Sequence, residues 1–151
     1  MESASSLRGV LYSVFDVEAG PVLRAQSPAD LMTPDVFESI ASYIITKPEI
    51  SGRTVKMMLG NFRLVGYPMC LPGTHFRRNE FLFNLFFAID AQADSVPFER
   101  VVKKLNNLLA ILEQESSYLS SPESNRHLPW LINSVFHRLH QSGECILPVN
   151  E

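Results

Sequence analysis

An almost unbroken apolar run from Phe81 to Ile89 constrains this chain more than any other stretch of its sequence. The run is too short to cross a bilayer, which takes roughly 20 residues, and too apolar for a strand with one face in water. It predicts a strand covered on both faces, in the middle of a sheet. Two arginines, Arg77 and Arg78, stand in the loop just before it. The sequence therefore predicts that both arginines lie at the end of the most rigid element of the domain.

The patterns around this run predict one α+β domain. The expected elements, in chain order, are strands at 9–16 and 22–26, a helix over 33–47, strands at 53–59, 62–71 and 79–90, and helices over 97–119 and 121–143. Pro68 predicts a bulge in the fourth strand, or a place where that strand fades. This β-β-α-β-β-β-α-α order favours a three-layer α/β/α sandwich around a five-stranded, mainly antiparallel sheet.

The first and third helices are expected to begin at a capping residue followed by proline, at Thr33-Pro34 and Ser121-Pro122. Pro129 predicts a kink in the third helix, or a late start near Leu128. The residues expected on the inner faces are, helix by helix, Phe37, Ile40, Ala41 and Ile44; Phe98, Val101, Val102, Leu105, Leu108, Leu109 and Leu112; and Leu128, Leu131, Ile132, Val135 and Leu139. The residues expected to face solvent on the second helix are Lys103, Lys104, Glu113 and Glu115. Trp130 and Phe136 fall partly off the inner face and are candidates for a contact surface.

The composition favours a soluble intracellular domain. The chain has 151 residues, of which 46% are hydrophobic and 19% charged, so it can bury a core and lacks the charge excess of disordered chains. The net charge of −3 gives no attraction for a phosphate backbone, which argues against nucleic-acid binding. Two cysteines far apart in sequence indicate a reducing compartment. The N-terminus has no signal-peptide pattern, so membrane contact is expected only through partners.

No metal or cofactor site is expected from the sequence. The phosphate-binding glycine motifs are absent. His137 and His140 share a helix face, but no nearby residue completes the three or four ligands that zinc needs, so a solvated polar face is favoured. Cys70 and His75 could form the reactive pair of a cysteine hydrolase, although a lone thiol is more often buried and inert.

Arg77 and Arg78 have two interpretations from the residues alone. Charged residues before an apolar strand commonly act as gatekeepers against aggregation. Alternatively, one arginine is supplied in trans to a GTPase, where it neutralises charge on the transferring phosphoryl group and raises hydrolysis on the order of a thousandfold or more. Such a residue must be exposed, and a loop anchored on a rigid central strand meets that need.

Ordered polar residues give the chain a specific resemblance, from about Gly9 to its end, to the nitrogen permease regulator 2-like family. The segments that carry it are Tyr43–Glu49, Gly66, Pro68, Cys70, Arg78-Asn79, Leu82–Leu85, Asp90–Ala93, Val102–Leu105, Leu112-Glu113 and Glu115–Ser117. The resemblance implies a longin (profilin-like) domain that pairs with the longin domain of a nitrogen permease regulator 3-like subunit, within a complex that has a third subunit. It implies that this complex activates Rag-type GTPases at the lysosomal or vacuolar membrane, and restrains target-of-rapamycin signalling and favours autophagy when amino acids are scarce.

The resemblance also assigns roles to the two arginines and to parts of the chain. The family's catalytic arginine falls on Arg78, the arginine finger, while Arg77 departs from the family pattern and is an auxiliary candidate. The expected organisation is a disordered tail over 1–7, a longin domain over 8–143 and the start of a linker to further domains over 144–151. A non-catalytic longin scaffold for heterodimerisation and docking remains the alternative function.

Overall fold

The computed structural model describes residues 6–44, 49, 51–73, 76 and 80–141. These residues form β1 (Leu7–Asp16), β2 (Gly20–Ser27), α1 (Pro34–Ile44), β3 (Val55–Leu59), β4 (Phe62–Gly66), β5 (Met69–Pro72), β6 (Glu80–Asp90), α2 (Val96–Ser116) and α3 (Pro122–Gln141). The expected boundary between tail and domain shifts, because β1 begins at Leu7, which is fully buried, and Ser6 before it is buried as well.

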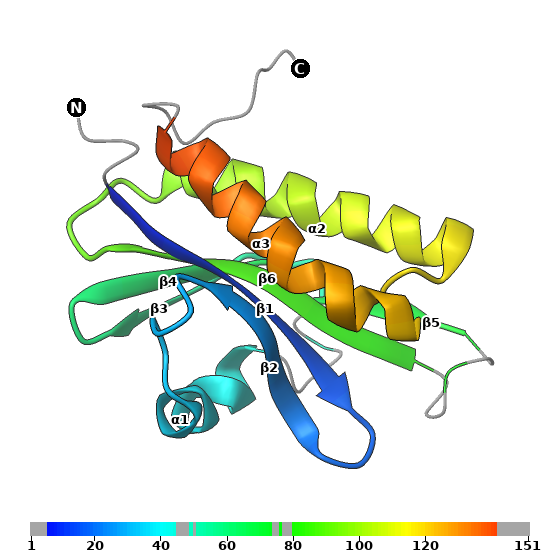
Figure 1. The fold of residues 1–151 in the computed structure, drawn as a ribbon. Coiled ribbons are helices and arrows are strands. Elements are labelled where there is room, and N and C mark those ends of the chain that lie inside the picture. The colour runs from blue at the N-terminus through cyan, green and yellow to red at the C-terminus, as the bar shows by residue number, and fades with distance from the viewer. Residues whose placement is uncertain (1–5, 45–48, 50, 74–75, 77–79, 142–151) are drawn as a thin grey trace.

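The elements form three layers, with α1 on one face of the sheet and α2 and α3 on the other (Figure 1). Phe86 packs with Phe37 of α1 in one apolar cluster. Phe87, its neighbour in β6, packs with Phe98 of α2 and Ile132 of α3 in the other cluster. The alternation of one strand between two cores is why its sequence is apolar throughout. The expected α+β three-layer sandwich is therefore confirmed, and it agrees with a longin-like fold.

The apolar run lies in the middle of the sheet, as predicted. The strand order is β2-β1-β6-β4-β3, with β5 also paired to β6, and each of these pairs is antiparallel. Every residue of β6 from Leu82 to Ile89 is buried. The end of β6 at Glu80 carries the loop that contains the two arginines.

The sheet has six strands rather than five, because the strand expected over 62–71 divides at Tyr67-Pro68 into β4 and β5. The pairs Gly66–Phe86 and Met69–Phe83 keep one register against β6, so no residue is inserted or lost at the break. Proline has no N–H to donate to a ladder. The predicted interruption at Pro68 is confirmed.

The prediction for α1 is confirmed at its start and along its inner face. The Thr33 hydroxyl accepts a hydrogen bond from the backbone N–H of Val36 at 3.2 Å, as a capping residue does. The buried residues of α1 are Phe37, Ile40, Ala41 and Ile44, the four that were expected. The predicted end at Lys47-Pro48 lies outside the described residues.

The inner face of α2 differs from the expectation on one side. Leu108 and Leu112 are 54% and 43% exposed, whereas Glu113, expected in solvent, is only 2% exposed. The Glu113 carboxylate accepts hydrogen bonds from the backbone N–H of Ser120 at 2.9 Å and from its hydroxyl at 2.7 Å. These bonds close the turn between α2 and α3, and they compensate for the burial of the carboxylate.

The Tyr12 hydroxyl of β1 is buried near this carboxylate. Its burial, with a smaller contribution from Glu113, raises the pKa of the Tyr12 hydroxyl.

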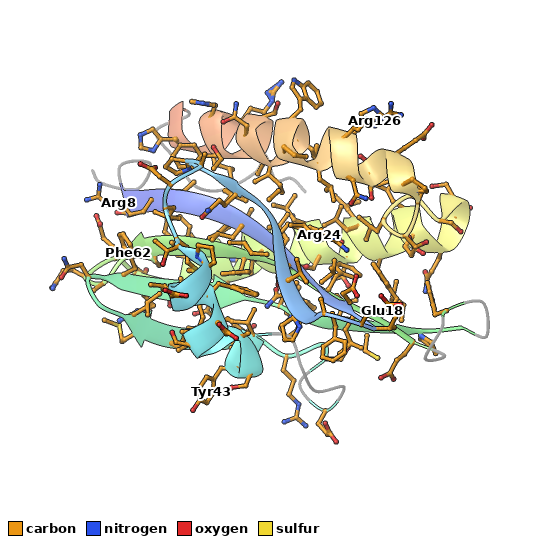
Figure 2. The ribbon with its side chains drawn as sticks, turned by 60° about the horizontal axis from the view of Figure 1, so that its bottom comes forward. Arg8, Glu18, Arg24, Tyr43, Phe62 and Arg126 are labelled. Atoms are coloured by element: carbon orange, nitrogen blue, oxygen red, sulfur yellow. The ribbon has the colours of Figure 1, made fainter. Side chains whose placement is uncertain are left out.

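The third helix begins at its capping serine and proline, so the alternative of a late start near Leu128 is wrong. Helix α3 runs from Pro122 to Gln141 with Pro129 inside it. Leu128, Ile132 and Leu139 are buried on its inner face, as expected. Tyr43 on α1 and Arg126 on α3 project from opposite sides of the molecule (Figure 2).

Candidate functional site

The candidate site is the end of the β5–β6 hairpin, where residues 73–79 connect the two strands. The last pair of the hairpin is Pro72 with Glu80. Arg77, Arg78 and His75 lie outside the described residues, so their predicted roles stay predictions. The described residues around them show instead how this loop is attached to the sheet.

On the face covered by α2 and α3, an aromatic stack leads from the loop into the core. The ring of Phe76 stacks on Phe81 at 5.4 Å between centroids, and Phe81 lies 5.8 Å from Phe83. Phe83 in turn lies 6.1 Å from Tyr12 of β1. Such ring pairs contribute about 0.5–1.5 kcal/mol each beyond the burial of their area. Because Phe76 directly precedes Arg77, the stack fixes the chain one residue before the arginines.

On the opposite face, Cys70 of β5 contacts Glu80 of β6. The thiol donates a hydrogen bond to the carboxylate, with 3.6 Å between Sγ and Oε1. Partial burial, then the negative charge of Glu80, raises the pKa of the Cys70 thiol to about 11. The thiol is therefore protonated at neutral pH, the opposite of what a nucleophile needs. This observation argues against the cysteine-hydrolase interpretation and favours a structural role for Cys70.

Two buried asparagines fill the break between β4 and β5. The Asn106 amide of α2 accepts from the backbone N–H of Leu85 and donates to its carbonyl, both at 2.8 Å. The Asn84 amide of β6 accepts from the N–H of Tyr67 at 3.0 Å and donates to the carbonyl of Ile44 at 3.1 Å. The amides thus bind three main-chain groups that a continuous strand would otherwise pair, those of Leu85 and the N–H of Tyr67, and Asn84 also binds the last carbonyl of α1.

Gly66 leaves the space that Asn84 occupies. A Cβ atom at position 66 would lie 2.8 Å from Asn84 Nδ2 and 3.0 Å from Oδ1. Sequence reasoning missed both asparagines. The available signal was a polar residue inside an apolar run at 84, and another at an inward helical position at 106.

The outer edge of β5 is bordered by a turn that follows α1. The backbone N–H of Gly52 donates to the carbonyl of Pro68 at 2.9 Å. The hydroxyl of Ser51 accepts from the backbone N–H of Cys70 at 2.8 Å. Sequence reasoning also missed this contact, because no local pattern signals a bond between a turn and a distant strand.

The remaining candidate residues lie elsewhere in the structure. His137 and His140 both contact the ring of Phe136, at 5.5 and 5.2 Å between centroids. Within the part of the chain that the structure describes, no group of three or more histidine, cysteine or carboxylate side chains could hold a metal ion. None of the described helices is long and apolar enough to span a membrane. Trp130 is 70% exposed on α3.

Comparison with known proteins gives a consistent family. Residues 5–128 match the family model described as Nitrogen permease regulator 2. The chain is 35% identical over 136 residues to the GATOR complex protein NPRL2 of Drosophila melanogaster, covering 89% of this chain and 33% of the relative. It is 24% identical over 153 residues to a nitrogen permease regulator 2 homolog of Schizosaccharomyces pombe, covering 96% of this chain and 37% of the relative. It is 28% identical over 116 residues to nitrogen permease regulator 2 of Saccharomyces cerevisiae, covering 76% of this chain and 19% of the relative. The chain thus spans between 19% and 37% of the length of these relatives.

Proposed function

The chain belongs to the nitrogen permease regulator 2 family, and we propose that it stimulates GTP hydrolysis by a Rag-type GTPase, with Arg78 as an arginine finger supplied in trans. The observation that carries this proposal is the attachment of the loop to the central strand through the stack of Phe76 on Phe81. An arginine finger needs an exposed loop whose base does not move, and the ends of this loop have such a base.

In this proposal the chain contributes electrostatic stabilisation of the transition state. Hydrolysis of GTP builds charge on the oxygens of the transferring phosphoryl group, and a positioned guanidinium stabilises that charge. Arginine remains protonated at any physiological pH and presents a planar fork of donors that fits phosphate oxygens. In this proposal Arg78 enters the GTPase site, Arg77 is auxiliary, and the nucleotide, metal ion and attacking water belong to the GTPase.

The setting of this activity is a complex of several subunits. The name of the Drosophila relative assigns that protein to a GATOR complex, which supports a role for this chain as a subunit of such a complex. In the proposal its longin domain pairs with that of a nitrogen permease regulator 3-like subunit, beside a third subunit. The partners bring it to the lysosomal or vacuolar membrane, where it lowers target-of-rapamycin signalling during amino-acid starvation.

Single-turnover hydrolysis of GTP by a Rag GTPase pair, with the assembled complex added, tests the proposal. We expect Arg78→Ala to lower the stimulated rate on the order of a thousandfold. Arg78→Lys keeps the charge but loses the planar fork, and should recover only part of the rate. Arg77→Ala is the matched control and should keep most of the rate. Equal rates for all variants, with binding intact, would contradict the proposal.

A non-catalytic longin scaffold is the second candidate, and exposed apolar side chains favour it. Leu108, Ile111 and Leu112 of α2 and Trp130 of α3 are exposed. Large apolar groups on a surface are typical of protein contacts when they lie together. This candidate predicts a stable heterodimer with the nitrogen permease regulator 3-like subunit in light scattering, and equal GTP hydrolysis with every arginine variant. Absence of a heterodimer would count against it.

A further inference from the structure

The strand that leads into the arginine loop has an unusual set of neighbours. Among the described strands, β5 pairs with β6 alone. Its connection to β4 is broken at Tyr67-Pro68, where Asn84 and Asn106 bind the main-chain groups that a continuous ladder would use. A short strand paired on one side resists displacement weakly, because few hydrogen bonds hold it. The position of β5 therefore depends on whatever borders its other edge.

The turn after α1 borders that edge. Ser51 Oγ lies 2.8 Å from the backbone nitrogen of Cys70, and the backbone nitrogen of Gly52 lies 2.9 Å from the carbonyl oxygen of Pro68. The Pro68 carbonyl accepts one of these bonds and the Cys70 N–H donates the other. The turn therefore binds this edge of β5 as a neighbouring strand would. Of the two bonds only the first uses a side chain, which makes Ser51 the residue that a substitution can remove selectively.

We propose that Ser51 is a positioning residue for the arginine loop. Its hydroxyl fixes the edge of β5 at Cys70, and β5 ends at Pro72, where the loop begins. The loop that contains Arg78 starts after Pro72 of β5 and ends before Glu80 of β6. In this proposal, the bond from Ser51 fixes the position of the first of these two ends. Ser51 itself touches neither nucleotide nor phosphate. The inference rests on the proposed function of Arg78 and adds to it a residue that acts through the main chain.

The test uses the assembled complex and a Rag GTPase pair under single-turnover conditions, with the complex titrated to saturation. Ser51→Ala should lower the saturating rate about 3- to 10-fold, the factor that corresponds to one hydrogen bond. The concentration that gives half-saturation should not change. Ser51→Thr keeps a hydroxyl and should restore the rate. Ser39→Ala is the matched control, since the Ser39 hydroxyl donates to the carbonyl of Val36 at 2.6 Å, a bond within α1.

Amide hydrogen exchange supplies a second readout that does not depend on GTP hydrolysis. The Cys70 amide should exchange faster in Ser51→Ala than in the wild type, and at the wild-type rate in Ser51→Thr and Ser39→Ala. An unchanged saturating rate in Ser51→Ala would overturn the inference, and so would an unchanged exchange rate. A change confined to the half-saturating concentration would also overturn it, because Ser51 would then contact the GTPase directly.

The same titration separates the two proposals. If Arg78→Ala abolishes stimulation and Ser51→Ala does not lower it, only the positioning role fails. If Arg78→Ala retains the full rate, the finger itself fails and no loop position can matter for it.

Discussion

The two ends of β6 are held in different ways. From Phe86 to Ile89, the strand has β1 on one side and β4 on the other, so ladders bind it on both edges, with one shift of register between Leu7 and Gly9 of β1. Pairing with β1 ends at Val14 and Phe83, so from Glu80 to Leu82 the only described strand that pairs with β6 is β5. An aromatic stack, a thiol–carboxylate contact and a turn complete its surroundings there. The first end is fixed by many similar ladder hydrogen bonds, and the second by a few individual side-chain contacts.

This difference separates stability from positioning. Many equivalent hydrogen bonds and buried rings at the Phe86–Asp90 end contribute to the free energy of unfolding, and no single bond determines where the strand lies. At the Glu80 end each group is single, so its loss should move the loop more than it destabilises the domain. Substitutions at the two ends are therefore expected to affect different measurements.

The largest effect is expected from a matched pair of phenylalanines in β6. Phe87 is fully buried and meets Phe98 edge-to-face at 6.1 Å, so Phe87→Ala should lower the free energy of unfolding by about 3–5 kcal/mol. Phe81, at the loop end, is only half-buried, and Phe81→Ala should cost about 1–2 kcal/mol. Urea unfolding of the chain measures both. Equal costs would mean that the two ends of the strand do not differ as described.

The next largest effect concerns the boundary between the two ends, at Leu85. Asn106→Leu keeps a similar volume but removes both partners of the Leu85 backbone, which is buried. Unpaired buried groups cost about 1–3 kcal/mol each, and burial of the apolar leucine side chain offsets part of this cost, so the unfolding free energy should fall by roughly 2–4 kcal/mol. Asn107→Leu, at an exposed neighbouring position, should change it by less than about 0.5 kcal/mol. A neutral Asn106→Leu would show that other groups pair with Leu85 in the variant.

The regular end of the strand could be predicted from sequence, and the irregular end could not. The run Phe81–Ile89 predicts a central strand because only two-sided burial explains nine apolar-rich positions without polar alternation. Pro68 marks the strand break because its missing N–H acts locally. In contrast, Ser51 bonds to a strand 19 residues away, and nothing in the intervening sequence encodes that register.

The error on α2 has a related physical cause. A helical stripe gives the direction of the apolar face, but its two margins depend on how closely the neighbouring elements cover it. Leu108 and Leu112 lie at one margin and are exposed, whereas Glu113 lies at the other and is buried under the turn to α3. The role of Arg78 as an arginine finger was predicted from its position before the central strand and from the family resemblance, and this role stays a prediction.

A smaller stability effect with a large functional consequence is expected at Phe76. Phe76→Ala removes the ring that stacks on Phe81 and should lower stimulated GTP hydrolysis by about tenfold, because the arginines lose their nearest fixed neighbour. The unfolding free energy should change by only about 1 kcal/mol, since one half-buried ring pair is lost. Phe76→Tyr keeps the ring and is the control. A loss of stability without loss of stimulation would assign Phe76 to the core rather than to the loop.

The smallest effect is expected for the contact between Cys70 and Glu80, and the reactivity of the Cys70 thiol at different pH values measures it. The pKa of the Cys70 thiol is raised from 9.0 to about 11, so less thiolate is present between these values than in a model peptide. Alkylation of Cys70 by iodoacetamide, followed by mass spectrometry of its peptide, should be slower than for the peptide at pH 8–10 and should rise towards pH 11.

The matched variant Glu80→Gln removes the negative charge that disfavours the thiolate. Its Cys70 should therefore react faster than the wild-type residue at the same pH, and slower than the free peptide, because burial, the larger cause, remains. The same shift makes stability depend on pH. The folded state binds the proton of the Cys70 thiol more tightly than the unfolded state does, so the thiol's contribution to the free energy of unfolding is fully present below pH 9 and is lost as the pH rises through 11. Identical reactivity in the wild type and in Glu80→Gln would mean that the carboxylate does not face the thiol, and that the loop end has one fewer individual contact than the structure describes.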